Sequence, residues 1–482
     1  MKKLLLGAVS AVALLAAGTA FAGDTSTVNQ PGNSNSANVN QTGSTTATSD
    51  VEQNSNSNTA NVTQAGSDNG SLVSQNTDGT YTGNNAYVDQ IGSNDHSDVG
   101  QYGYNYSAVV QDSGSSGESA YVRQTGYNPG SYGAGGATLY QNGINDSGAA
   151  VQTGDFNSAT LVQTGSGGAY NSVPYDNIDP GTLNAPDFGN RYGGVVQQVG
   201  NSNNAYIDQG GANGYAQLDA IGNSNTQAIY QLGGTSLATA FVNSEGNNNV
   251  SSVVQYGGYG NSPYSGNNQY GGSNSITVTQ TGSSRSLIGQ GTNLTDAPYG
   301  IPLFDGPQAF GAVAVVSQTG DDQSSTILQF DGSKATVTQI QDGSSTTNAS
   351  YVTQGAGSVG SDATVYQAGI GGTSTVDETG IAGGYDTADV TQTDTSSAAS
   401  STVTQTAYND YANVYQSGAT DGSTVTQNGD SDWASVNQSG STETSTVTQG
   451  GASDNATLTQ VSAGAGSTIM QNGAGNSAVV HQ

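Results

Sequence analysis

The sequence predicts an all-β protein, a flattened two-sheet β-solenoid whose coils are about 22 residues long. Three features indicate this fold class: a short motif recurs along the chain, it alternates with the period of a β-strand, and a glycine follows each copy. The motif reads small residue, any, aliphatic, any, Gln, any, Gly, as at 37–43, 60–66 and 434–440. In the closing stretch its glutamine returns every eleven positions, at Gln405, Gln416, Gln427, Gln438, Gln449, Gln460, Gln471 and Gln482.

The first 22 residues have the features of a secretory signal peptide. Lys2 and Lys3 precede an apolar stretch, and Ala20-Phe21-Ala22 is a small-residue cleavage site. The apolar stretch is too short for a membrane span. We therefore expect residues 1–22 to be removed and the mature chain, 23–482, to be exported without membrane insertion.

The composition limits both the core and the partners. The 71 glycines and the abundant Asn, Ser, Thr and Gln exclude a thick hydrophobic core, but a repeat needs to bury only a thin apolar strip. The formal charge of −30 becomes −32 once Lys2 and Lys3 are removed, which disfavours nucleic acid and anionic membranes as partners. Because the chain has no cysteine, no disulfide stabilises it.

Each repeat unit is expected to be one strand and one tight turn. In the unit at 37–43, Ala37, Val39 and Gln41 share one face, while Asn38 and Asn40 share the other. The glycine two residues after the glutamine supplies the turn. A unit is about eleven residues long, so that two units complete one coil of the solenoid.

The inward positions are the candidate site, a structural ladder with an aliphatic core. In a stacked solenoid each glutamine lies over an equivalent glutamine, and its side-chain NH2 can donate to the next side-chain carbonyl. We expect Asn58, Asn157, Asn203 and Asn476 to do the same at the turns. The candidate residues are Val39, Gln41, Val62, Gln64, Leu161, Gln163, Val425, Gln427, Val436, Gln438, Val447, Gln449, Leu458, Gln460, Ile469, Gln471, Val480 and Gln482.

The pattern is interrupted in two ways. Ala220, Ser244 and Glu378 stand where a glutamine is expected. Three longer interruptions, at about 164–194, 256–274 and 291–312, collect prolines and aromatic residues. Each begins at a turn, where a solenoid tolerates insertions, so we predict that all three are loops.

The fragments at 35–43 and 157–165, Asn-Ser-Ala-Asn-Val-Asn-Gln-Thr-Gly and Asn-Ser-Ala-Thr-Leu-Val-Gln-Thr-Gly, resemble curlin repeats. These are the repeats of curli subunits, which form extracellular amyloid fibres in bacterial biofilms. The resemblance covers nearly the whole mature chain outside the three interruptions. It implies a secreted structural subunit of a cell-surface fibre for biofilm matrix and adhesion, with a nucleator subunit and an outer-membrane secretion pore as partners.

This chain departs from the family in two respects. Curlins are commonly much shorter, and their fibre subunits usually carry a Gly/Asn-rich export segment before the repeats, whereas Val28-Asn29-Gln30 already reads as a repeat unit. Repeat units at 28–30 and 478–482 carry no polar cap, which leads us to expect head-to-tail self-association into a filament.

Other functions fit the residues less well than a fibre subunit. The mature chain has only His96 and His481, no cysteine and four scattered cations, so we expect no enzyme, cofactor or specific metal site. The acidic surface leaves weak cation binding open. The main alternative is a non-polymerising secreted or surface-attached adhesin, to which outward tyrosines would contribute. Ice binding by threonine pairs such as Thr424 and Thr426 is a weaker alternative.

Overall fold

The structure, a computed structural model, describes residues 23–76, 83–112, 116–128, 136–165, 193–211, 214–233, 237–256, 263–291, 309–330, 332–341, 347–355, 358–379, 384–393 and 397–482. The predicted signal peptide, 1–22, lies outside these residues.

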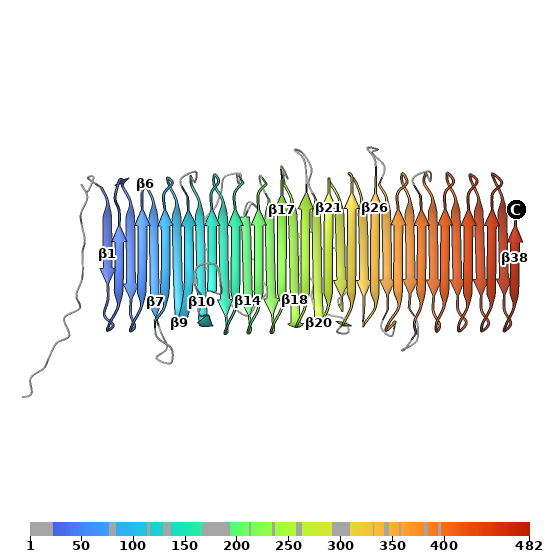
Figure 1. Cartoon of the computed structure of the whole chain (residues 1–482), viewed down its shortest axis with the longest axis horizontal. Coiled ribbons are helices and arrows are strands. Elements are labelled where there is room, and N and C mark those ends of the chain that lie inside the picture. The colour runs from blue at the N-terminus through green and yellow to red at the C-terminus, as the bar shows by residue number, and fades with distance from the viewer. Residues whose placement is uncertain are drawn as a thin grey trace, which may run out of the picture. The chain divides into compact units, whose positions relative to one another are not determined.

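The chain divides into two compact units, Met1–Gly234 and Thr235–Gln482, and in each unit the strands lie side by side as stacked turns (Figure 1). Both units are all-β solenoids without a helix in their described residues, and a turn has roughly 24 residues on average. The predicted fold class is therefore confirmed. We call the two sheets of the first unit 1A and 1B, and those of the second unit 2A and 2B.

In the first unit, sheet 1A contains β1 (Thr25–Asn29), β4 (Thr48–Gln53), β7 (Gly70–Asn76), β10 (Ser119–Asn128), β12 (Ser147–Thr153), β14 (Gly193–Val199) and β16 (Tyr215–Ile221). Sheet 1B contains β2 (Ser36–Asn40), β5 (Thr59–Gln64), β8 (Asn85–Gln90), β11 (Gly136–Gln141), β13 (Ser158–Gln163), β15 (Asn204–Gln209) and β17 (Thr226–Leu232). The long strand β9 (His96–Gln111) pairs with β7 and β10 in sheet 1A and with β8 and β11 in sheet 1B. Two short strands, β3 (Ser44–Thr45) and β6 (Gly66–Ser67), pair separately.

In the second unit, sheet 2A contains β18 (Thr239–Asn247), β20 (Tyr264–Gly272), β22 (Arg285–Gln290), β23 (Ala309–Phe310), β25 (Ser324–Gln329), β27 (Ala349–Gln354), β29 (Thr373–Glu378), β31 (Ser400–Gln405), β33 (Gly422–Gln427), β35 (Thr444–Gln449) and β37 (Gly466–Gln471). Sheet 2B contains β19 (Val250–Tyr256), β21 (Ser275–Thr281), β24 (Val313–Thr319), β26 (Lys334–Ile340), β28 (Asp362–Gln367), β30 (Thr387–Gln392), β32 (Tyr411–Gln416), β34 (Trp433–Gln438), β36 (Asn455–Gln460) and β38 (Ser477–His481).

Neighbouring strands within each sheet are parallel and keep the repeat in register. In the closing turns the partners lie 22 residues apart, as in the series Val403, Val425 and Val447. The offset grows to 46 residues between β13 and β15, where Leu161 lies beside Ile207. The predicted 22-residue coil is thus the spacing of the closing turns. Elsewhere the offset falls to 21 residues, as between Asn85 and Tyr106, or is lengthened by insertions, without changing which side chains stack.

The core of each unit is a thin layer between its two sheets. Inward aliphatic side chains are almost completely buried: Val62 and Leu161 are 1% exposed, and Val436 is 0% exposed. The intervening side chains of β34, such as Asn437, are half-buried or exposed. This alternation explains how so polar a chain folds, since one aliphatic residue and one alanine or serine per strand complete the apolar strip.

The turns place non-glycine residues in the left-handed region at regular intervals. Ser431, Thr442 and Ser453 have φ of 61°, 60° and 58°, one in each successive eleven-residue unit. Other turns use glycine because the next turn is too close for a side chain. A Cβ on Gly154, whose φ is 108°, would lie 2.1 Å from the carbonyl oxygen of Gly200.

We expect Gly154→Ala to lower the free energy of unfolding more than Gly43→Ala. Both glycines have positive φ, and left-handed strain costs an alanine about 1–2 kcal/mol. Only Gly154 adds the clash with the next turn, since a Cβ on Gly43 meets no atom within 4 Å. Overpacking typically costs a further 1–3 kcal/mol or so. Denaturant unfolding of both variants measures the difference, and equal losses would contradict the assigned turn contact.

One of the three predicted loops is corrected by the structure. The interval 256–274 contains β20 (Tyr264–Gly272), which pairs with β18 and β22. Its residues lack the usual aliphatic, because Asn267 fills that inward position and is fully buried. The other two predicted loops, at about 164–194 and 291–312, fall mostly on residues 166–192 and 292–308, which lie outside the described residues.

Candidate functional site

Four rows of glutamine side chains run through the cores, and we call them ladders 1A, 1B, 2A and 2B after their sheets. Wherever two glutamines follow each other in a row, Nε2 of one donates to Oε1 of the next, over 2.5–3.3 Å. Ladder 1A contains Gln30, Gln53, Gln75, Gln101, Gln124, Gln152 and Gln198. Ladder 1B contains Gln41, Gln64, Gln90, Gln111, Gln141, Gln163, Gln209 and Gln231.

The second unit repeats this arrangement. Ladder 2B contains Gln255, Gln280, Gln318, Gln339, Gln367, Gln392, Gln416, Gln438, Gln460 and Gln482. Ladder 2A contains Ser244, Gln269, Gln290, Gln329, Gln354 and Glu378, and then Gln405, Gln427, Gln449 and Gln471.

Most ladder amides also bind the backbone of the facing sheet, a contact that the sequence does not predict. Gln438 Nε2 donates to Gln460 Oε1 and to the carbonyl oxygen of Gly422 in sheet 2A, both at 3.0 Å. Gln438 Oε1 in turn accepts from Gln416. Both N–H groups and the carbonyl are therefore satisfied, which removes the cost of burying the amide. The ladders join successive turns and also hold the two sheets together.

The structure places most of the predicted ladder and core residues as expected. The side chains of Val62, Gln64, Leu161, Gln163, Val425, Gln427, Val436, Gln438, Val447, Gln449, Leu458, Gln460, Ile469 and Gln471 are buried. In the outermost described turns, Val39, Gln41 and Val480 are half-buried and Gln482 is exposed. Gln41 and Gln482 still join ladders 1B and 2B.

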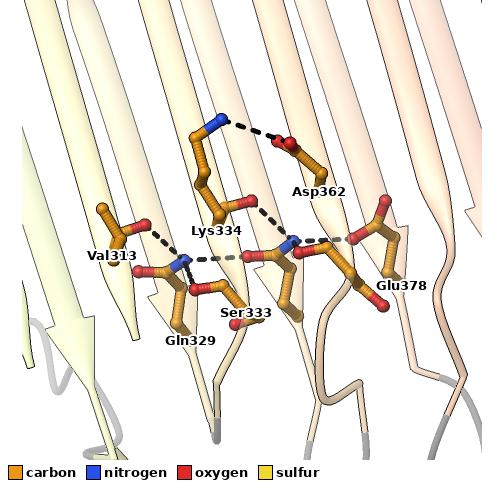
Figure 2. A network of polar contacts seen from close by, with 8 residues as sticks. Val313, Gln329, Ser333, Lys334, Asp362 and Glu378 are labelled. Carbon is orange, nitrogen blue, oxygen red and sulfur yellow. Dashed lines mark hydrogen bonds and ion pairs between the residues drawn. The ribbon is translucent and has the colours of Figure 1, made fainter. Parts of the chain in front are cut away.

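The three positions without glutamine behave differently. Ser244 Oγ donates to Gln269 Oε1 at 2.8 Å and so replaces the amide. Ala220 lies beside Gln198 in sheet 1A and offers no polar group. Glu378 accepts from Gln354 Nε2 at 2.7 Å, and Figure 2 shows the row reaching Glu378 from Gln329.

The turn asparagines form stacks of a different kind from the one predicted. The backbone N–H of the residue one turn on donates to the asparagine side-chain oxygen, as from Asn84 to Asn58 and from Asn203 to Asn157, both at 3.0 Å. The side-chain NH2 binds a turn carbonyl instead, for example from Asn157 to Gly200 at 2.7 Å. Because the stack needs only a side-chain acceptor, aspartate can replace asparagine in it.

Aspartate does so in the second unit, in what we call the aspartate column: Asp386, Asp410, Asp432 and Asp454. Each Oδ1 accepts the backbone N–H of the next turn at 2.8–3.1 Å, ending at Asn476. Each Oδ2 is buried without a hydrogen-bond partner. Burial raises the pKa of Asp410 to about 7, an effect that the Asp432 N–H opposes and the carboxylates of Asp386 and Asp432 reinforce.

The outward faces carry few charge pairs and several aromatic residues. Lys334 Nζ lies 3.2 Å from Asp362 Oδ2, and both side chains are substantially exposed, so this pair contributes little to stability. The rings of Tyr411 and Trp433 stack with centroids 6.1 Å apart. Tyr415 is 38% exposed on the same sheet.

The described residues contain no group of three or more His, Cys, Asp or Glu side chains placed to hold a metal ion. Within the same residues, no helix has the length and apolar character needed to cross a membrane. In comparisons with known proteins, no protein-family model and no curated protein matches the sequence. The chain is thus a β-solenoid repeat protein with stacked Gln and Asn side chains.

Proposed function

We propose that the protein is a structural subunit of an extracellular, curli-like functional amyloid fibre that assembles head-to-tail in bacterial biofilm matrix and surface adhesion. One observation carries this proposal: from β31 to β38, each turn offers the next turn the same backbone and glutamine groups, in the same register, that it receives from the turn before. The steps Gln416 to Gln438 and Gln438 to Gln460 are alike, at 2.9 and 3.0 Å.

A repeated interface of this kind is suited to self-assembly. The groups that join turn to turn inside one copy are chemically the ones needed to join a turn of one copy to a turn of another. Such a contact is heterologous and does not close, so it extends into a filament. Parallel strands stacked in register with amide ladders are also the stabilising features of amyloid.

The proposal extends to the partners and to the location. It includes secretion across the outer membrane through a pore, a nucleator subunit that starts growth, and a pilus-like fibre at the cell surface. It assigns no catalytic activity, no cofactor, no nucleic acid and no membrane insertion. These elements rest on the likeness of the repeats to curlin repeats and on the acidic charge of the chain.

Electron microscopy of the purified chain 23–482 tests the proposal. We expect unbranched fibres that bind amyloid dyes, and fragments of those fibres should shorten the lag phase of fresh protein. A chain that remains monomeric and folded at high concentration would contradict the fibre and favour a non-polymerising adhesin. Depletion from solution by growing ice, with no fibres, would favour the ice-binding alternative.

Assembly is expected to be faster at pH 5 than at pH 7.5, and faster at high salt. A carboxyl whose pKa is raised by folding, such as Asp410 with a value of about 7, binds more protons in the folded state. Its contribution to the stability of the fold is fully present below the pKa of the unfolded state and is lost as the pH rises through the pKa of the folded state. Salt acts separately by screening repulsion among the outward acids. The lag time of dye fluorescence measures both effects.

The matched variant Asp410→Asn/Asp432→Asn separates the aspartate column from the rest of the charge. Asparagine keeps the acceptor for the next backbone N–H and adds the NH2 group that turn asparagines use in the first unit. At pH 7.5 the lag time of this variant should be closer to the lag time of the parent at pH 5. Added salt should still shorten the lag time of the variant. An unchanged pH response in the variant would rule out the column as the cause.

A further inference from the structure

Ladder 2A changes its chemistry at Glu378. This side chain is 0% exposed and fills the glutamine position of β29, in register with Gln405 of β31. Gln354 Nε2 donates to Glu378 Oε2, and so the row that starts at Ser244 reaches Glu378 intact (Figure 2). At this position a glutamine would donate onward to Gln405.

The step from Glu378 to Gln405 has two buried acceptors and no donor. Neither Glu378 Oε1 nor Gln405 Oε1 has a hydrogen-bond partner. The Gln405 amide cannot supply the donor by turning over, because its Nε2 already donates to Gln427 Oε1 and to the carbonyl of Thr387. An ionised carboxylate has no hydrogen to give, whereas a protonated carboxyl has one O–H.

We propose that Glu378 carries a proton in the folded protein and that its O–H donates to Gln405 Oε1, so that ladder 2A continues through this step. The proton is then part of the structure, and it replaces one of the two N–H groups of a glutamine. A neutral glutamic acid is close in shape to glutamine, which explains why the strand pairing continues unbroken from β27 through β31.

The surroundings of Glu378 favour its neutral form. Burial raises the pKa of Glu378 to about 8; the bond from Gln354 opposes this, and the carboxylates of Asp386, Asp362 and Asp377 add to it. Asp377 is the preceding residue of β29, while Asp362 begins β28 and Asp386 precedes β30 in the facing sheet. The side chains beside Glu378 in its own ladder, from β27 and β31, are neutral amides.

The nearest cation of that facing sheet does not neutralise Glu378. Lys334 Nζ is paired with Asp362 Oδ2 at 3.2 Å on the outward side of sheet 2B (Figure 2). Loss of the Glu378 proton would therefore leave an uncompensated negative charge on Glu378, next in its ladder to the unpaired Oε1 of Gln405. We expect the protonated Glu378 to contribute stability that is fully present below its unfolded-state pKa of about 4.5. This contribution is lost as the pH rises through its folded-state pKa of about 8.

The decisive variant is Glu378→Gln, which restores the ladder residue and removes the proton. Between about pH 4.5 and pH 8, unfolding of the parent releases the proton of Glu378. The unfolding equilibrium constant of the parent, divided by that of the variant, should therefore increase with rising pH by up to about tenfold per pH unit. Glu52→Gln is the matched control, because Glu52 is an outward, half-buried residue of β4. It should leave the pH dependence of the parent unchanged.

A second readout detects the proton itself. Infrared spectra of the chain labelled with 13C at its glutamate carboxyls should show, at pH 6.5, a protonated-acid C=O band that Glu378→Gln weakens. The carboxylate band should not change. If the variant instead removes carboxylate absorbance, or if parent and variant share the same pH dependence of unfolding, Glu378 is ionised in the fold and the proposal fails. This test uses the folded chain alone and does not depend on fibre formation.

Discussion

Val436→Asp is expected to abolish stable folding of the turns around β34 at pH 7. Val436 is 0% exposed between the sheets, where a carboxylate finds neither water nor a cation. The new aspartate would have to take up a proton, and protonating it about three pH units above its ordinary pKa costs about 4 kcal/mol. Loss of valine packing adds to this cost. Denaturant unfolding and the yield of assembled protein both measure the effect.

Asn437→Asp is the matched control, since it adds the same charge one residue later. Asn437 is exposed on the outward face of β34, and its neighbours in register are Tyr415 and Thr459, neither of them acidic. We expect a change in stability within about 0.5 kcal/mol. Comparable losses in the two variants would contradict the assigned direction of the side chains.

Gln438→Leu is expected to lower the free energy of unfolding by about 2–5 kcal/mol, although leucine is apolar and similar in size. The change removes the ladder partner of two buried groups, one N–H of Gln416 and the Oε1 of Gln460, and of the half-buried carbonyl of Gly422. Each orphan costs about 1–3 kcal/mol, and the hydrophobic gain of leucine offsets only part of the sum.

The same substitution at Asn437 distinguishes the loss of ladder hydrogen bonds from the general effect of replacing an amide side chain by leucine. Asn437→Leu replaces an amide on the exposed face and orphans no ladder group. Its effect should be small, and the difference between the two variants measures the contribution of the ladder. A tolerated leucine at 438 would mean that ladder 2B is a consequence of strand stacking and contributes little to stability.

The repeat and the direction of its side chains could be predicted because both follow from short-range periodicity. The eleven-residue spacing from Gln405 to Gln482 predicts strand, turn and stacking together, and the structure has the same register there. The fixed phase between Val436 and Gln438 likewise predicts that both point inward.

Other features depend on contacts that periodicity does not encode. The bond from Gln438 to the carbonyl of Gly422 requires the offset between facing sheets. Strand β20 does not follow from the motif because Gly266 and Asn267 replace its usual residues, although Gln269 with Gly271 two residues later retains part of it. The aspartates at turns resembled ordinary turn residues, and only the stacked backbone N–H groups reveal their role as acceptors.

Electron cryomicroscopy of fibres grown from the chain 23–482 tests the central claim most directly. The account predicts strands about 4.8 Å apart along the fibre axis, two facing sheets in cross-section, and continuous glutamine ladders across the junction between one copy and the next. Fibres in which the solenoids lie side by side, with their axes across the fibre, would contradict head-to-tail assembly. A chain that forms no fibres under any of the acidic or high-salt conditions would contradict the proposed function itself.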